Sequence, residues 1–130
     1  MKVLCVGCFD IFHYGHLCHL EASHKMGSPL IVAITRNRSV DKGAGRPYND
    51  EKYRAAIVKA LWCVSKVLLV DTSLEALKKT DPDIFSLGQD YRGNVLSEDL
   101  AYCKTKGIRI RFTNERRMSS TDIYDRLRHS

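Results

Sequence analysis

The sequence lacks any uninterrupted apolar stretch of the roughly 20 residues that a membrane-spanning helix requires. At the amino terminus, Gly7 and Asp10 interrupt the first apolar run too early for a signal peptide. The chain also lacks internal repeats, low-complexity segments and a disulfide framework, because its five cysteines are odd in number and scattered. These absences predict a cytoplasmic protein with reduced thiols and no contact with a membrane.

Positive charge is in excess, since 21 lysines and arginines face 15 acidic residues and give a net charge of +6. Such an excess favours anionic partners, among them nucleotides, sugar phosphates and nucleic acids. Part of it lies in residues 109–128, a stretch that is equally consistent with a solvated surface. The 130 residues, 44% of them hydrophobic, predict a single domain over residues 1–130.

Strand and helix patterns alternate along the chain. Apolar runs at 3–6 and 30–34 predict parallel strands buried on both faces, and residues 17–24 between them recur at helical spacing. Gly27 and Pro29 end that helix. Further strands are predicted at 67–70, 83–87 and 108–112, and further helices at 50–61, 74–79, 97–106 and from about 120. The alternation predicts an α/β fold with a parallel five-stranded sheet flanked by helices.

The loop that follows the first strand carries a candidate site. Ligands of open α/β sheets bind at the carboxyl ends of the strands, where residues 7–16 are expected to lie. Gly7 and Gly15 permit a close approach of backbone and ligand, and a helix amino terminus favours anions. His13 and His16 are three residues apart, so both imidazoles can face one anion and stabilise charge that develops on a phosphate.

Other interpretations of these residues stay open. His13, His16 and His19 could form a metal site, although three side chains at a spacing of three converge poorly. A histidine at a helix start can also be a cap. Cys5 and Cys8 form a CxxC pair, but Cys5 lies within a predicted buried strand, which favours a structural cysteine.

The segment from Gly7 to His16, GCFDIFHYGH, resembles the G-x-FD-x-x-H-x-GH motif of the cytidylyltransferase-like nucleotidyltransferases. The resemblance extends nearly over the whole chain and implies a single Rossmann-like domain. It implies attack of an acceptor phosphate on the α-phosphorus of an NTP, with release of pyrophosphate. It also implies Mg²⁺ that enters with the NTP, with Asp10 ordering the loop and helping to place the ion, and a homodimer.

The same resemblance assigns roles to individual positions. The expected catalytic residues are His13, His16 and Lys42. The expected nucleotide-binding residues are Gly7, Cys8, Phe9, Asp10, Gly15, Gly88, Gln89, Asp90, Arg116, Arg117, Met118, Ser119, Ser120 and Thr121. Arg54 and, more weakly, Arg46 are candidates for contact with the acceptor phosphate.

The choice of nucleotide depends on finer features. Residues 87–93, LGQDYRG, resemble a segment near the base and sugar in glycerol-3-phosphate cytidylyltransferase, which favours CTP and a polyol phosphate. The adenylyltransferase branch, with heptose-phosphate or FMN-type acceptors, shares the HxGH residues and a stretch like 46–49. Cys8, Asn37 and residues 114–117 depart from the cytidylyl pattern. A basic nucleic-acid-binding module is the alternative of another class, but no RNP, KH or zinc-finger pattern supports it.

Overall fold

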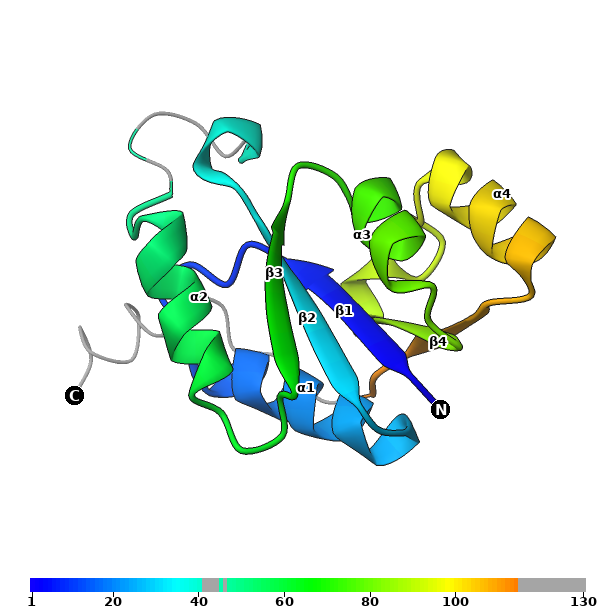
Figure 1. Ribbon diagram of the computed structural model, residues 1–130, viewed down its shortest axis with the longest axis horizontal. Coiled ribbons are helices and arrows are strands. Elements are labelled where there is room, and N and C mark those ends of the chain that lie inside the picture. The colour runs from blue at the N-terminus through cyan, green and yellow to red at the C-terminus, as the bar shows by residue number, and fades with distance from the viewer. Residues whose placement is uncertain (41–44, 46, 115–130) are drawn as a thin grey trace.

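Five parallel strands form one sheet in the order β3-β2-β1-β4-β5 (Figure 1). The computed structural model describes residues 1–40, 45 and 47–114. The strands are β1 (Val3–Gly7), β2 (Leu30–Thr35), β3 (Lys66–Val70), β4 (Ile84–Leu87) and β5 (Arg109–Phe112). The helices are α1 (Tyr14–Met26), α2 (Glu51–Lys59), α3 (Ser73–Thr80) and α4 (Ser97–Lys106). The predicted Rossmann-like α/β fold with a five-stranded parallel sheet is confirmed.

Each face of the sheet has its own apolar layer, because successive residues of a strand point to opposite faces. Val3 and Cys5 of β1 belong to the layer that includes Leu20 of α1 and Val58 of α2. Leu4 of β1 belongs to the other layer, which holds residues of α3 and α4. The helices are therefore divided in pairs between the two faces, as Figure 1 shows. This explains why the central strands are continuous apolar runs.

Two short 3₁₀ turns follow strand ends and were not expected from the sequence. They are η1 (Asn37–Ser39), after β2, and η2 (Gln89–Tyr91), after β4. Both lack apolar periodicity, the signal on which the helix predictions depended. The helix predicted from about residue 120 lies outside the described residues. None of the helices in the described part of the chain has the length and apolarity needed to cross a bilayer.

Candidate active site

The chain leaves β1 at the point where the strand order reverses, with β2 on one side and β4 on the other. Such a switch point is where open α/β sheets bind ligands. Two adjoining pockets lie there, a smaller one of about 100 Å³ and a larger one of about 370 Å³. The residues that line both are Val6, Gly7, Cys8, Leu87 and Tyr91. The two pockets therefore meet at the carboxyl end of β1.

His13 and His16 form a stacked pair at the start of α1. Their ring centroids are 3.9 Å apart, and the rings are inclined by 25°. His13 is the N-cap residue, and its Nδ1 accepts a hydrogen bond from the Gly15 N–H at 3.1 Å. The His13 N–H in turn donates to Nδ1 of His16 at 3.2 Å. The sequence prediction that both imidazoles lie together at this helix start is consistent with this geometry.

These two backbone hydrogen bonds define which ring nitrogen carries the proton. A neutral imidazole whose Nδ1 accepts a hydrogen bond has its proton on Nε2. His13 and His16 therefore each carry an Nε2–H donor, and His16 lines the smaller pocket. His19, also on the lining, is bonded through Nδ1 to Thr113 Oγ1 at 3.0 Å. Within the described residues, no three His, Cys, Asp or Glu side chains gather as a metal site.

Gly7 and Phe9 shape the loop around His16. A Cβ at Gly7 would lie 2.8 Å from Cε2 of Phe9, so any larger residue there would require that ring to shift. Phe9 packs edge-on against the His16 imidazole, with 5.4 Å between the ring centroids. Phe9 and Ile11 have φ angles of 53° and 48°, a left-handed conformation that is unfavourable for both residue types. Surrounding contacts must stabilise this loop.

Asp10, between those two residues, supplies such contacts. Its carboxylate is 8% exposed and accepts hydrogen bonds from the N–H groups of Tyr48, at 2.6 Å, and Asn49, at 2.9 Å. Burial raises the pKa of Asp10, but the N–H groups of Asn49, Tyr48 and Ile11 and the charge of Arg54 outweigh it and lower the pKa. Both oxygens thus bind backbone N–H groups, which favours the loop-ordering role of Asp10 over a metal-binding one.

Arg54 lies in the interior and joins three segments. Its side chain is 0% exposed, although arginines are seldom fully buried. The guanidinium donates to the carbonyl oxygens of Cys8 and Thr35 at 2.9 and 2.8 Å, and to that of Asn49 at 3.0 Å. A fourth hydrogen bond reaches Asn37 Oδ1 at 2.7 Å. Arg54 does not line the larger pocket. These contacts suit Arg54 to support the loop structure, and its contact with an acceptor phosphate stays a prediction.

Of the three residues expected after β4, Gly88 lines the smaller pocket and is buried. Gln89 and Asp90 are exposed. In the amide orientation that satisfies both groups, the Gln89 nitrogen lies 2.8 Å from the Thr113 carbonyl oxygen and its oxygen 3.0 Å from Arg92 Nε. The structure thus brings Gly88 to the site, and Gln89 contacts the end of β5 instead.

Eight of the positions singled out from the sequence lie outside the described residues. They are Lys42, Arg46, Arg116, Arg117, Met118, Ser119, Ser120 and Thr121. The remaining predicted nucleotide-binding residues, Gly7, Cys8, Phe9, Asp10 and Gly15, all fall in the described first loop and the start of α1.

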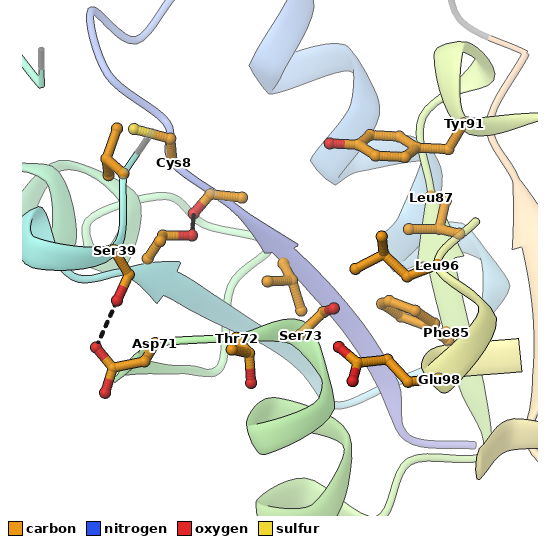
Figure 2. A pocket seen from close by; sticks show the side chains of 14 residues that line it. Cys8, Ser39, Asp71, Thr72, Ser73, Phe85, Leu87, Tyr91, Leu96 and Glu98 are labelled. Atoms are coloured by element: carbon orange, nitrogen blue, oxygen red, sulfur yellow. Dashed lines mark hydrogen bonds between the residues drawn. The ribbon is translucent and has the colours of Figure 1, made fainter. Parts of the chain in front are cut away.

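The larger pocket brings in residues that the sequence analysis missed. Those with polar side chains are Thr35, Ser39, Asp71, Thr72, Ser73 and Glu98. Figure 2 shows Ser39, Asp71 and Thr72 across the pocket from the apolar side chains of Phe85, Leu87 and Leu96, with Glu98 beside Phe85. Residues 71–73 directly follow β3, so the rule that ligands bind at strand ends could have found them. Glu98 comes from the start of α4, and only the packing of that helix brings it here.

Charged groups surround the rim of this pocket at Asp71. Its carboxylate accepts hydrogen bonds from Arg38, at 2.8 and 2.7 Å, from Arg36 at 3.2 Å and from Ser39 at 2.7 Å. The hydrogen bonds from Arg38 and Ser39 hold the pKa of Asp71 well below its usual range, although burial opposes the shift. Asp71 is therefore ionised and paired at neutral pH.

The chain is similar to a known protein family and to several named relatives. The family model described as cytidylyltransferase-like matches residues 4–126. Bifunctional protein HldE from Campylobacter fetus subsp. fetus is 42% identical over 67% of this chain and 20% of its own length. Bifunctional protein HldE from Azorhizobium caulinodans is 44% identical over 65% of this chain and 19% of its own length. The chain thus spans about a fifth of the curated relatives it matches.

Two crystal structures share the fold. A lipopolysaccharide core biosynthesis protein from Thermoplasma volcanium matches with a TM-score of 0.73 and 26% identity, over 92% of this chain and 98% of that one. Pantoate-beta-alanine ligase from Francisella tularensis matches with a TM-score of 0.65 and 15% identity, over 98% of this chain and 69% of that one, and supports the fold alone. The match over residues 4–126, which includes the His13–His16 pair, shows that the chain belongs to the cytidylyltransferase-like family of nucleotidyltransferases.

Proposed function

We propose that the chain is an adenylyltransferase that transfers AMP from ATP to a sugar phosphate of the heptose-phosphate type and releases pyrophosphate. The similarity to HldE proteins supports the adenylyl alternative better than CTP with glycerol-3-phosphate, which the sequence features favoured. The similar Thermoplasma protein, a lipopolysaccharide core biosynthesis protein, is consistent with a sugar acceptor.

The observation that carries the proposal is the pair of Nε2–H donors of His13 and His16 at a helix start. Donors held in place by backbone hydrogen bonds can bind phosphate oxygens and stabilise the charge that develops on them. The amino terminus of α1 adds backbone N–H groups and a favourable dipole for the same anion. We assign the triphosphate to this region and the nucleoside to the side of Gly88.

The larger pocket, across β1 from the histidines, is then available to the acceptor. Because the two pockets share Gly7 and Cys8, an acceptor phosphate and the α-phosphate of ATP can meet at the end of β1. An oxygen of the acceptor phosphate forms a bond to the α-phosphorus, and the bond from that phosphorus to the bridging oxygen of pyrophosphate breaks. His13 and His16 stabilise the charge that builds up on the phosphate oxygens, and the chain supplies no covalent intermediate.

Mg²⁺ is proposed to enter with ATP, where it neutralises charge on the triphosphate. Both Asp10 oxygens already accept backbone N–H groups, so no step in this mechanism depends on a metal bound by Asp10. Lys42, Arg116 or Arg117, and Ser119 to Thr121 stay predicted triphosphate ligands. The predicted homodimer is tested by light scattering of the purified chain.

Pyrophosphate release tests the proposal. Purified protein would be given Mg²⁺ and each of ATP, CTP, GTP and UTP, with a heptose phosphate or glycerol-3-phosphate as acceptor. His16→Ala is expected to lower kcat by about 100- to 1,000-fold, as loss of one transition-state donor does in other enzymes. His24→Ala is the matched control, because His24 lies on the same helix and lines neither pocket. Equal rates for the two variants would contradict the role given to His16.

A further inference from the structure

The larger pocket has two unlike walls. Phe85, Leu87 and Leu96 form an apolar wall, the side chains of Ser39, Asp71 and Thr72 lie across from it, and Glu98 lies at its edge beside Phe85 (Figure 2). In Figure 2, the Ser73 hydroxyl and the Glu98 carboxylate are directed toward the same part of the pocket. A ligand here would meet carbon atoms on one side and oxygen atoms on the other.

Ser73 has a fixed hydrogen-bonding direction. It is the first residue of α3, and its hydroxyl donates to Oδ2 of Asp99 at 2.5 Å. Asp99 is in the first turn of α4 and is 3% exposed, so it is not itself part of the pocket wall. A serine hydroxyl has one proton and two lone pairs. Because the Ser73 hydroxyl hydrogen is engaged in the hydrogen bond to Asp99, the hydroxyl can only accept a hydrogen bond from a ligand.

Glu98, the other polar residue at this end of the pocket, also accepts hydrogen bonds. The Glu98 carboxylate, when ionised, is also an acceptor only. Asp71 differs, because Arg36, Arg38 and Ser39 already bind its carboxylate. The end of the pocket near Ser73 and Glu98 therefore favours a ligand that brings hydrogen-bond donors, and the negative charge of Glu98 disfavours a phosphate there.

Burial of the Asp99 carboxylate lowers the free energy of unfolding. Its Oδ1 is buried and has no hydrogen-bond partner among the described residues. Burial raises the pKa of Asp99, and the Ser73 hydroxyl opposes that shift. The Ser73 hydroxyl is thus the group that stabilises the buried carboxylate, and the carboxylate in turn fixes the hydroxyl.

We propose that Ser73, fixed as a hydrogen-bond acceptor by Asp99, is a specificity-determining residue that binds a hydroxyl group of the acceptor substrate together with Glu98. Asp99 acts through Ser73 and is a positioning residue. The inference rests on the proposed function, and it orients the acceptor: the polyhydroxylated part lies toward Ser73 and Glu98, and the phosphate lies toward Gly7 and Cys8. The apolar wall contacts the C–H groups of the same molecule.

The test compares Ser73→Ala, Asp99→Ala and Asp99→Asn in two measurements. The first is equilibrium binding of a heptose phosphate and of inorganic phosphate without nucleotide; the second is the steady-state kinetics of pyrophosphate release. We expect Ser73→Ala and Asp99→Ala to weaken binding of the heptose phosphate and raise its KM by about 3- to 10-fold, the effect of one hydrogen bond. The KM for ATP and kcat should stay unchanged. Asp99→Asn keeps an oxygen that accepts from Ser73 and should restore most of the affinity.

Ser97→Ala is the matched control, because Ser97 is the first residue of α4, as Ser73 is of α3, and does not line the pocket. Binding of the heptose phosphate that is the same in Ser73→Ala as in Ser97→Ala would overturn the inference. So would an equal loss of affinity for inorganic phosphate, since Ser73 would then contact the phosphate. Ser73-dependent binding without pyrophosphate release would support the inference and contradict the proposed transfer. Pyrophosphate release with an unchanged KM for the heptose phosphate in Ser73→Ala would support the proposed transfer and contradict the inference.

Discussion

Replacing Arg54 with methionine removes four hydrogen bonds to oxygen atoms, and a longer one to the Cys8 sulfur, from the interior of the molecule. The side chain is 0% exposed, and its partners are the carbonyl oxygens of Cys8, Thr35 and Asn49 and the amide oxygen of Asn37. A buried polar group left without a partner costs about 1–3 kcal/mol. At about 1 kcal/mol for each of the four acceptors, the free energy of unfolding should fall by about 3–5 kcal/mol.

This loss is a large part of the roughly 5–15 kcal/mol that stabilises an ordinary domain. It corresponds to a decrease of about 10–20 °C in Tm for a chain of this size. Urea denaturation followed by circular dichroism would measure it. Arg38→Met is the control, because Arg38 is an exposed arginine with a carboxylate partner, and its side chain is 73% exposed. Loss of this exposed ion pair should lower the free energy of unfolding far less.

The same pair of variants decides between two roles for Arg54. If Arg54 supports the loops, Arg54→Met should have a lower free energy of unfolding. At a temperature where it is still folded, kcat/KM should fall for ATP and for the acceptor alike. An unchanged midpoint of denaturation, with a higher KM for the acceptor alone, would refute the reasoning from burial. It would restore the acceptor-binding role that the sequence suggested.

Two further predictions concern the first loop. Asp10→Asn should lower the free energy of unfolding by about 2 kcal/mol at pH 7, through the loss of charge-assisted hydrogen bonds. Because the pKa of Asp10 is lowered in the fold, its stabilisation is complete above the unfolded value of 3.8 and lost as the pH falls through the folded value. Denaturation at pH 7, 5 and 3 should show the gap to wild type narrowing below about pH 4; a constant gap would contradict this account. Gly7→Ala should displace the Phe9 ring, which contacts His16, and lower kcat as well as Tm. Gly107→Ala, at a φ of 70° where no neighbour lies within 4 Å, should cost about 1 kcal/mol by backbone strain and leave kcat unchanged.

Much of the fold could be predicted because each element has a local signal. The apolar runs at 3–6 and 30–34 and the stops at Gly27 and Gly107 depend on neighbouring residues only, and the structure confirms the strands and helices that they delimit. The parallel sheet follows from the alternation of those elements. The short 3₁₀ turns after β2 and β4 lack such a periodic signal.

The candidate site was predictable in part, for a related reason. His13 and His16 lie three residues apart on one helix start, so their proximity is a local property. The bonds of Asp10 to Tyr48 and Asn49 span 38 and 39 residues, and the bond of Ser73 to Asp99 spans 26. Such pairs exist only after the helices have packed on the sheet.

Arg54 shows what the sequence alone did not indicate. The family resemblance made it a candidate for the acceptor phosphate, but an arginine is seldom fully buried, so its burial was not foreseen. On α2, however, Arg54 and Val58 are the buried residues, four apart on one face of the helix. The carbonyl groups at the ends of β1 and β2 then supply enough acceptors to keep the charge buried.

The central claim is the transfer of AMP to a sugar phosphate at the His13–His16 pair. The most direct measurement is ³¹P NMR of the purified chain with ATP, Mg²⁺ and a heptose phosphate, beside an identical reaction with CTP. With ATP, the account predicts a new pair of coupled diphosphate signals from the nucleotidyl sugar and one molecule of pyrophosphate for each molecule of product. His16→Ala should give neither under the same conditions. Formation of the diphosphate with CTP alone would contradict the adenylyl assignment, and equal formation by His16→Ala would contradict the site.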